Sequence, residues 1–115
     1  SLLSASKHKL DNLIVLIDYN KLQSYGKTSE ILNLEPLTDK FKSFNFNSYN
    51  INGHNIKEIK LTIEKALKFK NKPSVIICHT VKGKGINIAE GNPSWHHRSF
   101  LNENDLFKIE KSLGK

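Results

Sequence analysis

Short apolar runs alternate with amphipathic stretches along this chain. Leu13–Ile17 and Val75–Cys78 are continuous apolar runs with several β-branched residues, which is typical of strands buried on both faces of a parallel sheet. Residues 46–51 alternate weakly in polarity and predict a further strand. Strands separated by amphipathic helices indicate the α/β class, with a parallel sheet and flanking helices.

The clearest predicted helix follows Asn55, which with Glu58 three residues later makes a start that resembles a capping box. Apolar residues recur every three or four positions along this helix and predict one apolar stripe, formed by Ile56, Ile59, Ile63 and Leu67. Shorter helices are expected from Leu2 to about Leu10, from a cap at Thr38 to Phe44, and after a cap at Asn102 with Leu106, Ile109 and Leu113. Residues 21–35 and 79–101 are predicted to be loops.

Three strands form a narrow sheet for this class of fold. The 115 residues suffice for one small domain but not for two. The chain contains no Met, and its first predicted helix starts abruptly at Leu2. We therefore expect residues 1–115 to be part of one larger domain.

The composition narrows the class of protein. The net charge is +7, but Arg98 is the only arginine and the lysines are spread along the chain, which disfavours nucleic-acid binding. No apolar run is long enough to cross a membrane. The only cysteine, Cys78, lies in an apolar run, which excludes a disulfide framework and predicts a buried thiol in a reducing, cytoplasmic environment.

Two polar segments follow predicted strands, where ligands bind in open parallel sheets. Asp18–Leu22 offers side-chain and backbone oxygens of the kind that Mg²⁺ prefers. His79–Gly85 combines two lysines with two glycines, which lets backbone amides and an ammonium approach phosphate. Together the segments suggest a metal–diphosphate site, although each alone is also an ordinary turn.

These segments carry a resemblance to a known family. Residues 13–26, LIVLIDYNKLQSYG, resemble the metal-binding segment of transketolases. Residues 77–85, ICHTVKGKG, and residues 92–98, NPSWHHR, look like two later segments of the same domain, and Gly53-His54 resembles the family's turn before a helix. The resemblance covers nearly the whole chain and is closest to the type in which the two halves of transketolase are separate polypeptides. It implies the thiamine diphosphate-binding fold.

The resemblance implies a role for each matching residue. The side-chain oxygen of Asn20 and the backbone carbonyl of Leu22 would bind Mg²⁺, or Ca²⁺ or Mn²⁺ in its place, and the metal would bridge to the diphosphate of thiamine diphosphate. Lys82 would neutralise diphosphate charge, and Gly83 would let the backbone pass close to the cofactor.

A histidine completes the implied site. His96 matches the family histidine that contacts the diphosphate and reaches toward the substrate, and a shift of one residue to His97 stays open. Gln23 or Ser24 would line the cofactor cleft. Trp95 is expected to pack its loop down rather than to contact substrate.

The resemblance also implies an activity and partners. A transketolase transfers two-carbon ketol units between sugar phosphates in the pentose phosphate pathway of carbohydrate metabolism, and works as a dimer of the complete unit. Its catalytic glutamate would come from a complementary segment or subunit. The family's Gly-Asp-Gly metal segment would fall about ten residues before Ser1, so the chain alone is expected to be inactive and to bind cofactor poorly.

Three alternatives remain beside this interpretation. One is a non-catalytic remnant or assembly module, against which Asn20, Lys82 and His96 count. Another is an enzyme like deoxyxylulose-phosphate synthase, which shares the cofactor, although residues 95–98 fit transketolase better. A basic nucleic-acid-binding module is the least favoured.

Overall fold

The computed structural model describes residues 1–114 and divides the chain into two compact units. One unit comprises residues 1–19 and 34–80, and the described part of the other comprises residues 20–33 and 81–114. Each unit therefore combines two segments that are distant in the sequence.

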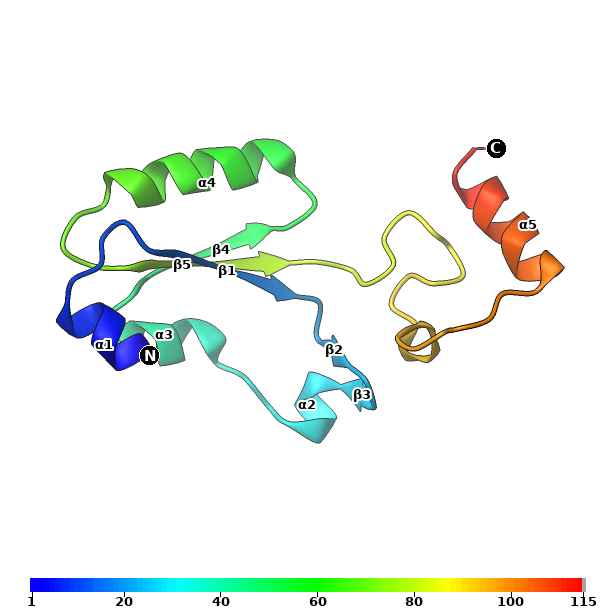
Figure 1. Ribbon diagram of the computed structural model, residues 1–115, viewed down its shortest axis with the longest axis horizontal. Helices are drawn as coiled ribbons and strands as arrows, with labels where there is room; N and C mark the ends of the chain where they lie inside the picture. The colour runs from blue at the N-terminus through cyan, green and yellow to red at the C-terminus, as the bar shows by residue number, and fades with distance from the viewer. Residues whose placement is uncertain (115) are drawn as a thin grey trace. The chain divides into compact units, whose positions relative to one another are not determined.

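A parallel sheet forms the centre of the first unit. It contains β1 (Ile14–Tyr19), β5 (Ser74–His79) and β4 (Asn47–Asn52), in the order β1-β5-β4 (Figure 1). Ser74 lies beside the first residues of both neighbouring strands, and His79 lies beside the last residues of both. The three strands are thus in full register, and their carboxyl ends are flush. The predicted three-stranded parallel sheet is confirmed. The predicted burial of residues 13–17 on both faces is wrong, because β1 is the first strand in the order β1-β5-β4 and its Leu16 is 55% exposed.

Helices cover both faces of this sheet (Figure 1). On one face lie α1 (Leu2–Lys7) and α3 (Leu37–Ser43), and on the other lies α4 (Ile56–Lys68). The core under α1 and α3 is built from buried apolar side chains, namely Ala5, Tyr19, Phe46, Val75 and Ile77. Because β5 is central and covered on both faces, its residues from Ser74 to Ile77 are all buried, as its continuous apolar sequence predicts.

The second unit has short elements joined by long irregular segments. Strands β2 (Leu22–Gln23) and β3 (Gly26–Lys27) pair as an antiparallel hairpin, which α2 (Thr28–Ile31) follows. The remainder contains the 3₁₀-helix η1 (Pro93–Trp95) and α5 (Glu103–Ser112). The expectation of a loop over residues 21–35 was therefore incomplete.

The start of α3 differs from the prediction. The helix begins at Leu37 after Pro36, and the Leu37 N–H donates a hydrogen bond to Glu35 Oε2 at 3.3 Å. Thr38 lies inside the first turn, where its hydroxyl accepts a hydrogen bond from Asn50 Nδ2 at 2.8 Å. The predicted cap at Thr38 is wrong because this hydroxyl bonds to β4 rather than to its own helix.

The predicted apolar stripe of α4 is only partly correct. Ile59 and Ile63 are half-buried, but Ile56 is 81% exposed and Leu67 is 53% exposed. The fully buried positions of the helix are the smaller side chains of Thr62 and Ala66. Small side chains let a helix approach a sheet closely. The most buried positions of α4 are therefore Thr62 and Ala66, and the larger Ile59 and Ile63 beside them are only half-buried.

The start of α4 is close to the prediction. Asn55 Oδ1 accepts a hydrogen bond from the backbone N–H of Glu58 at 3.2 Å. Glu58 Oε2 accepts from the N–H of Asn52 at 3.3 Å. The carboxylate thus reaches one turn further back than a capping box requires.

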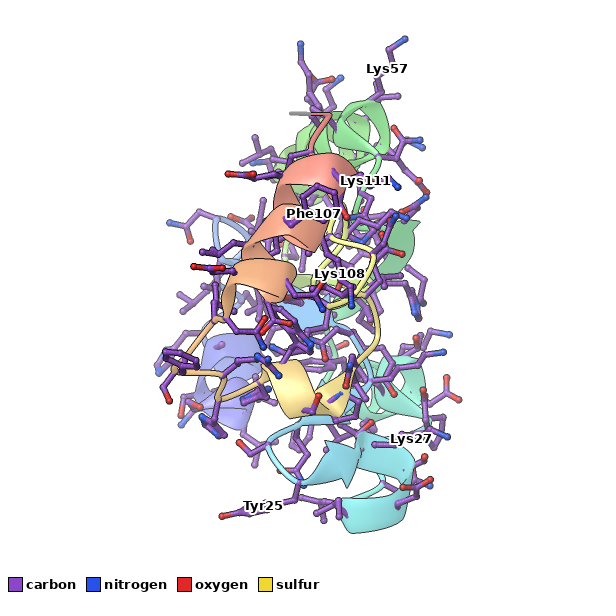
Figure 2. The ribbon with its side chains drawn as sticks, turned by 90° about the vertical axis from the view of Figure 1, so that its right-hand side faces the viewer. Tyr25, Lys27, Lys57, Phe107, Lys108 and Lys111 are labelled. Carbon is purple, nitrogen blue, oxygen red and sulfur yellow. The ribbon has the colours of Figure 1, made fainter. Side chains whose placement is uncertain are left out.

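Two remaining expectations concern Cys78 and α5. Cys78 is half-buried rather than buried, and burial, followed by the negative charge of Asp18, raises the pKa of its thiol. None of the residues of α5 is buried, and Phe107 is 64% exposed beside Lys108 and Lys111 (Figure 2).

Within residues 1–114, no helix has both the length and the apolar character needed to cross a membrane.

Candidate functional site

The carboxyl ends of β1 and β5 are tied together. The Thr80 hydroxyl donates a hydrogen bond to Asp18 Oδ1, and the Thr80 backbone N–H donates to the carbonyl of Tyr19 at 3.3 Å. Asn20 and Lys82 follow Asp18 and Thr80 by two residues each. The two candidate segments therefore leave the sheet from neighbouring strand ends.

Asn20 organises the first candidate segment. Its Oδ1 accepts a hydrogen bond from the Leu22 backbone N–H at 2.9 Å, and Lys21 between them has a φ of 61°. Asn tolerates and promotes such local turns. The carboxamide oxygen has two lone pairs, so one stays available after the bond to Leu22. Both predicted metal-binding residues thus belong to one turn, and the turn leaves Asn20 able to bind a cation.

Gln23 and Ser24 follow this turn. Ser24 is half-buried at the turn of the β2–β3 hairpin, and Tyr25 beside it is 87% exposed and extends away from the hairpin (Figure 2). The Gln23 Nε2 atom is buried and has no hydrogen-bond partner among the described residues. A buried donor without a partner is uncommon in folded proteins. Gln23 therefore has a stronger structural reason than Ser24 to meet a ligand.

The segment after β5 folds onto itself around Gly83. The Lys82 carbonyl accepts a hydrogen bond from the Gly91 N–H at 2.9 Å. Gly83 has a φ of +72°, and a Cβ placed on it would lie 2.7 Å from the carbonyl oxygen of Ala89. Only glycine fits such a position. Packing within the segment therefore requires Gly83, whichever ligand passes near it.

The two lysines of this segment are in different environments. Lys84 forms an ion pair with Glu90 at 3.2 Å, and Glu90 Oε1 also accepts a hydrogen bond from the Gly85 N–H at 2.9 Å. Lys82 is half-buried and forms no ion pair within the described part of the chain. Of the two ammonium groups, that of Lys82 is the one available for a bound anion.

His96 follows the short helix η1. Asn92 Oδ1 caps this helix by accepting from the Ser94 N–H at 3.0 Å, and the His96 N–H donates to the Pro93 carbonyl at 3.0 Å. The His96 side chain is half-buried, and its Nδ1 is buried without a hydrogen-bond partner among residues 1–114. The helix and its cap therefore determine where this imidazole lies.

Three effects lower the pKa of His96: burial first, then the positive charges of Lys82 and His97. The imidazole is therefore neutral at pH 7, with one nitrogen that donates and one that accepts a hydrogen bond. His97 is exposed, and its ring lies edge-to-face against that of His96 with the centroids 4.7 Å apart. Burial and the proximity of Lys82 favour His96 over His97 as the functional histidine.

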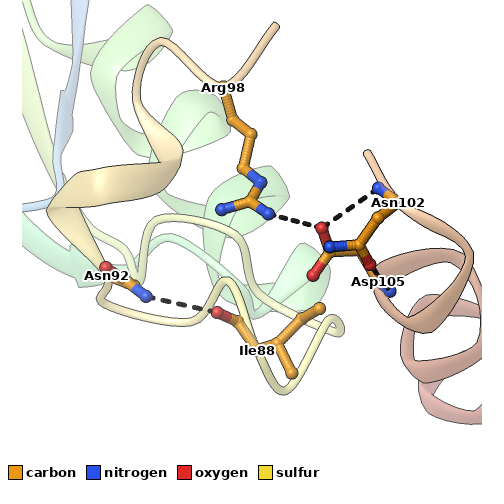
Figure 3. Close-up of polar contacts among 5 residues, drawn as sticks. All are labelled: Ile88, Asn92, Arg98, Asn102 and Asp105. Carbon is orange, nitrogen blue, oxygen red and sulfur yellow. Dashed lines mark hydrogen bonds and ion pairs between the residues drawn. The ribbon is translucent and has the colours of Figure 1, made fainter. Parts of the chain in front are cut away.

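Arg98 holds the residues after His96 in place. Its guanidinium lies 4.8 Å from the centre of the Trp95 ring. It also forms a hydrogen-bonded ion pair with Asp105 of α5 (Figure 3). Asp105 also accepts from the Asn102 N–H at 3.3 Å, while Asn102 Oδ1 accepts from the Asp105 N–H at 2.8 Å. Asn102 thus caps α5 as predicted, whereas the Arg98–Asp105 ion pair was not predicted from the sequence. Asp105 could have been identified from the sequence, because Asn102 and Asp105 have the spacing of a capping box.

Opposing effects act on the Asp105 carboxyl. Burial alone would raise its pKa, but hydrogen bonds from Arg98 and Asn102 and the charges of Arg98 and Lys108 bring the pKa below its ordinary value. Asp105 is therefore ionised at neutral pH.

The metal-binding potential of the chain lies in amide and carbonyl oxygens. Among residues 1–114, no three His, Cys, Asp or Glu side chains gather to hold a metal ion. The Asn20 and Leu22 oxygens are hard donors of the type that suits Mg²⁺. They fit the implied metal as two ligands of a larger set.

Comparison with known proteins decides the family. The family model described as "Transketolase, thiamine diphosphate binding domain" matches residues 1–115. The chain belongs to this transketolase family. The α/β fold with its parallel sheet agrees, since the chain superposes on the crystal structure of transketolase from Campylobacter jejuni with a TM-score of 0.85. That match has 33% sequence identity and covers 98% of this chain and 17% of the C. jejuni chain.

Two relatives in the transketolase family are named as subunits of their enzymes. The chain is 42% identical over 96 residues to an apulose-4-phosphate transketolase subunit of Actinobacillus succinogenes, covering 84% of this chain and 34% of that protein. It is 42% identical over 99 residues to 6-deoxy-6-sulfo-D-fructose transketolase subunit SqwG of a Clostridium species, covering 86% of this chain and 36% of that protein. The chain thus spans about a third of the length of these curated relatives.

Proposed function

We propose that this chain binds the diphosphate of thiamine diphosphate and its divalent metal within a transketolase that transfers two-carbon ketol units between sugar phosphates. The observation that carries the proposal is the half-buried His96, whose Nδ1 has no partner in the described chain. Burial, followed by the positive charge of Lys82, lowers the pKa of this imidazole. A hydrogen-bond donor or acceptor on a ligand would pair with this Nδ1 atom, and a diphosphate would offset the positive charge of Lys82. Membership of the thiamine diphosphate-binding family supports this assignment.

Each residue contributes a separate function. Asn20 Oδ1 and the Leu22 carbonyl would hold Mg²⁺, with Ca²⁺ or Mn²⁺ as substitutes. Lys82 would bind a diphosphate oxygen, and the turn at Gly83 would bring backbone amides near it. Gln23, whose Nε2 is buried without a partner among the described residues, or Ser24 from the same hairpin would line the site. When bound, thiamine diphosphate supplies the electron sink that cleavage of a carbon–carbon bond needs.

His96 would act on protons. A neutral imidazole donates one hydrogen bond and accepts another, so His96 can bind a diphosphate oxygen through one nitrogen and a substrate hydroxyl through the other. A neutral imidazole can also accept a proton from a substrate hydroxyl and later return it. His96 is accordingly the catalytic residue that we assign in this chain.

Other groups of the active site would come from a partner. Two relatives of this chain are named as transketolase subunits, which supports a complementary subunit that carries the catalytic glutamate. We propose that the complete unit forms a homodimer in the cytoplasm. The chain alone would lack activity because further ligands for the metal must come from outside residues 1–115.

Calorimetric titration with thiamine diphosphate and MgCl₂ tests this proposal. The full chain is titrated alone and after mixing with transketolase polypeptides that carry the remainder of the site. We expect weak binding by the chain alone and tight binding by the mixture, with affinity reduced about tenfold or more by His96→Gln or Lys82→Gln. His8→Gln is the matched control, because His8 is exposed in the other unit.

Each alternative outcome contradicts a defined part of the proposal. Tight binding by the chain alone would contradict the need for a partner. Mixtures that never bind cofactor would make the chain a non-catalytic assembly module. Salt-sensitive DNA binding would favour the basic-module interpretation, and formation of deoxyxylulose phosphate would favour the related synthase.

A further inference from the structure

Side-chain contacts hold the chain in place both before and after His96. Before it, Asn92 Nδ2 donates a hydrogen bond to the Ile88 carbonyl at 3.4 Å (Figure 3). After it, Arg98 forms a hydrogen-bonded ion pair with Asp105, which belongs to the first turn of α5. His96 thus lies between one attachment to the preceding loop and another to the following helix.

Arg98 is the side chain that connects these parts. Its guanidinium contacts the face of Trp95, the residue before His96, and also the carboxylate of Asp105, nine residues after His96 in the sequence. The Asp105 side chain is only 13% exposed. A partly buried ion pair with a planar guanidinium has a defined geometry, unlike an exposed lysine pair. Stacking on Trp95 restricts the guanidinium further.

No hydrogen bond at Nδ1 within residues 1–114 orients the His96 imidazole. The His96 backbone is held through Pro93 on one side, and residues 97 and 98 continue into the Arg98 contacts on the other. His97, whose ring lies against that of His96, belongs to the same fastened stretch.

We propose that Arg98 and Asp105 are positioning residues for His96, and that their ion pair sets the direction of the imidazole by joining the Trp95–Arg98 segment to α5. The inference rests on the proposed function of His96, which it deepens. Neither residue needs to touch the cofactor or the substrate. The helix α5 then serves as the support against which the histidine is aligned.

The test compares two substitutions at the same helix start by NMR of the His96 ring in the full chain. Asp105→Asn keeps an oxygen that accepts from the Asn102 N–H, but it removes the charge that holds Arg98. Asn102→Ala removes the oxygen that caps α5 and leaves the Arg98–Asp105 pair in place. Both weaken the start of the helix, and only the first breaks the ion pair.

We expect Asp105→Asn to shift and broaden the His96 ring signals, and Asn102→Ala to shift amide signals of α5 while leaving the ring signals in place. Arg98→Gln should reproduce the effect of Asp105→Asn, and the double variant should add nothing further, since both residues act through one pair. Arg98→Lys should restore part of the wild-type spectrum because it keeps the charge.

Two results would overturn the positioning role. One is that the NMR signals of the His96 ring are unchanged in Asp105→Asn. The other is that Asn102→Ala changes these signals as strongly as Asp105→Asn does, which would show a general effect of weakening the start of α5. In the complemented protein, Asp105→Asn should also weaken binding of inorganic pyrophosphate with Mg²⁺ about tenfold, as for residues that orient metal ligands. Failure of the wild type to bind pyrophosphate would count against the proposed function alone, since the ring signals test the positioning role by themselves.

Discussion

The hydroxyl of Thr80 donates a hydrogen bond to the carboxylate of Asp18, joining the carboxyl ends of β5 and β1. These side chains are 62 residues apart in the sequence. They meet because the two strands are parallel and in register, with Asp18 beside Cys78 and Tyr19 beside His79. The starting points of the segments with Asn20 and Lys82 are thereby held next to each other.

Replacing Thr80 by Val should lower the free energy of unfolding by about 1 kcal/mol, because it removes this hydrogen bond at a partly exposed position while keeping the side-chain shape. Thr80→Ser is the control, since it keeps the hydroxyl. Urea unfolding followed by circular dichroism measures both. Equal stability of the Val and Ser variants would contradict a stabilising role for the hydrogen bond.

Gly83→Ala should lower the stability of the second unit by about 2–5 kcal/mol, the sum of a left-handed backbone and a forced contact with Ala89. Gly91→Ala is a matched control, because Gly91 has a φ of +63° with open space around its Cβ position, and should cost about 1–2 kcal/mol. Trp95 is the only tryptophan, so its fluorescence reports unfolding of this unit. Similar losses in the two variants would contradict the contact with Ala89.

The Arg98–Asp105 pair should make the second unit sensitive to acid. The pKa of Asp105 is lower in the folded state than its ordinary value of about 3.9. Its stabilising contribution is therefore complete above that value and is lost as the pH falls through the folded pKa. Thermal unfolding between about pH 2 and pH 6 should show this loss in the wild type, and Asp105→Asn should reduce it. An identical pH dependence in both proteins would contradict the linkage.

Lys82→Gln should raise the pKa of His96, because it removes a positive charge that disfavours the protonated imidazole. The pKa should stay below its ordinary value, since burial, the largest cause, is unchanged. Lys84→Gln is the control, because Lys84 pairs with Glu90 and is not among the groups that lower the pKa of His96. NMR titration of the His96 ring measures the change. No difference between the two lysine variants would contradict the proximity of Lys82.

The parts of the fold that were predictable have a strong local pattern. β5 was predictable because a strand covered on both faces is apolar throughout, and α5 because Asn102 starts it with a recognisable cap. The stripe of α4 was misassigned because periodicity does not reveal that the sheet meets Thr62 and Ala66. The cap at Thr38 failed because its partner, Asn50, comes from another element.

In the candidate site, too, features with a local sequence pattern were predictable and contacts between separate elements were not. Its location after two parallel strands was predictable from the order of elements, and the structure places Asn20 and Leu22 in one turn and His96 near Lys82. The pairs Asp18–Thr80 and Arg98–Asp105 were not predictable, because each depends on how two separate elements are brought together. The roles of these residues toward cofactor and metal remain predictions that the titrations above test.

The full register of β1, β5 and β4 constrains how members of this family vary in length. Inserting or deleting one residue inside a strand would turn every later side chain of that strand to the opposite face and move its end by about 3.3 Å. The Thr80–Asp18 contact would then be lost together with the core. Length changes between homologues should therefore fall outside these strands, while residues 14–19, 47–52 and 74–79 should align without gaps.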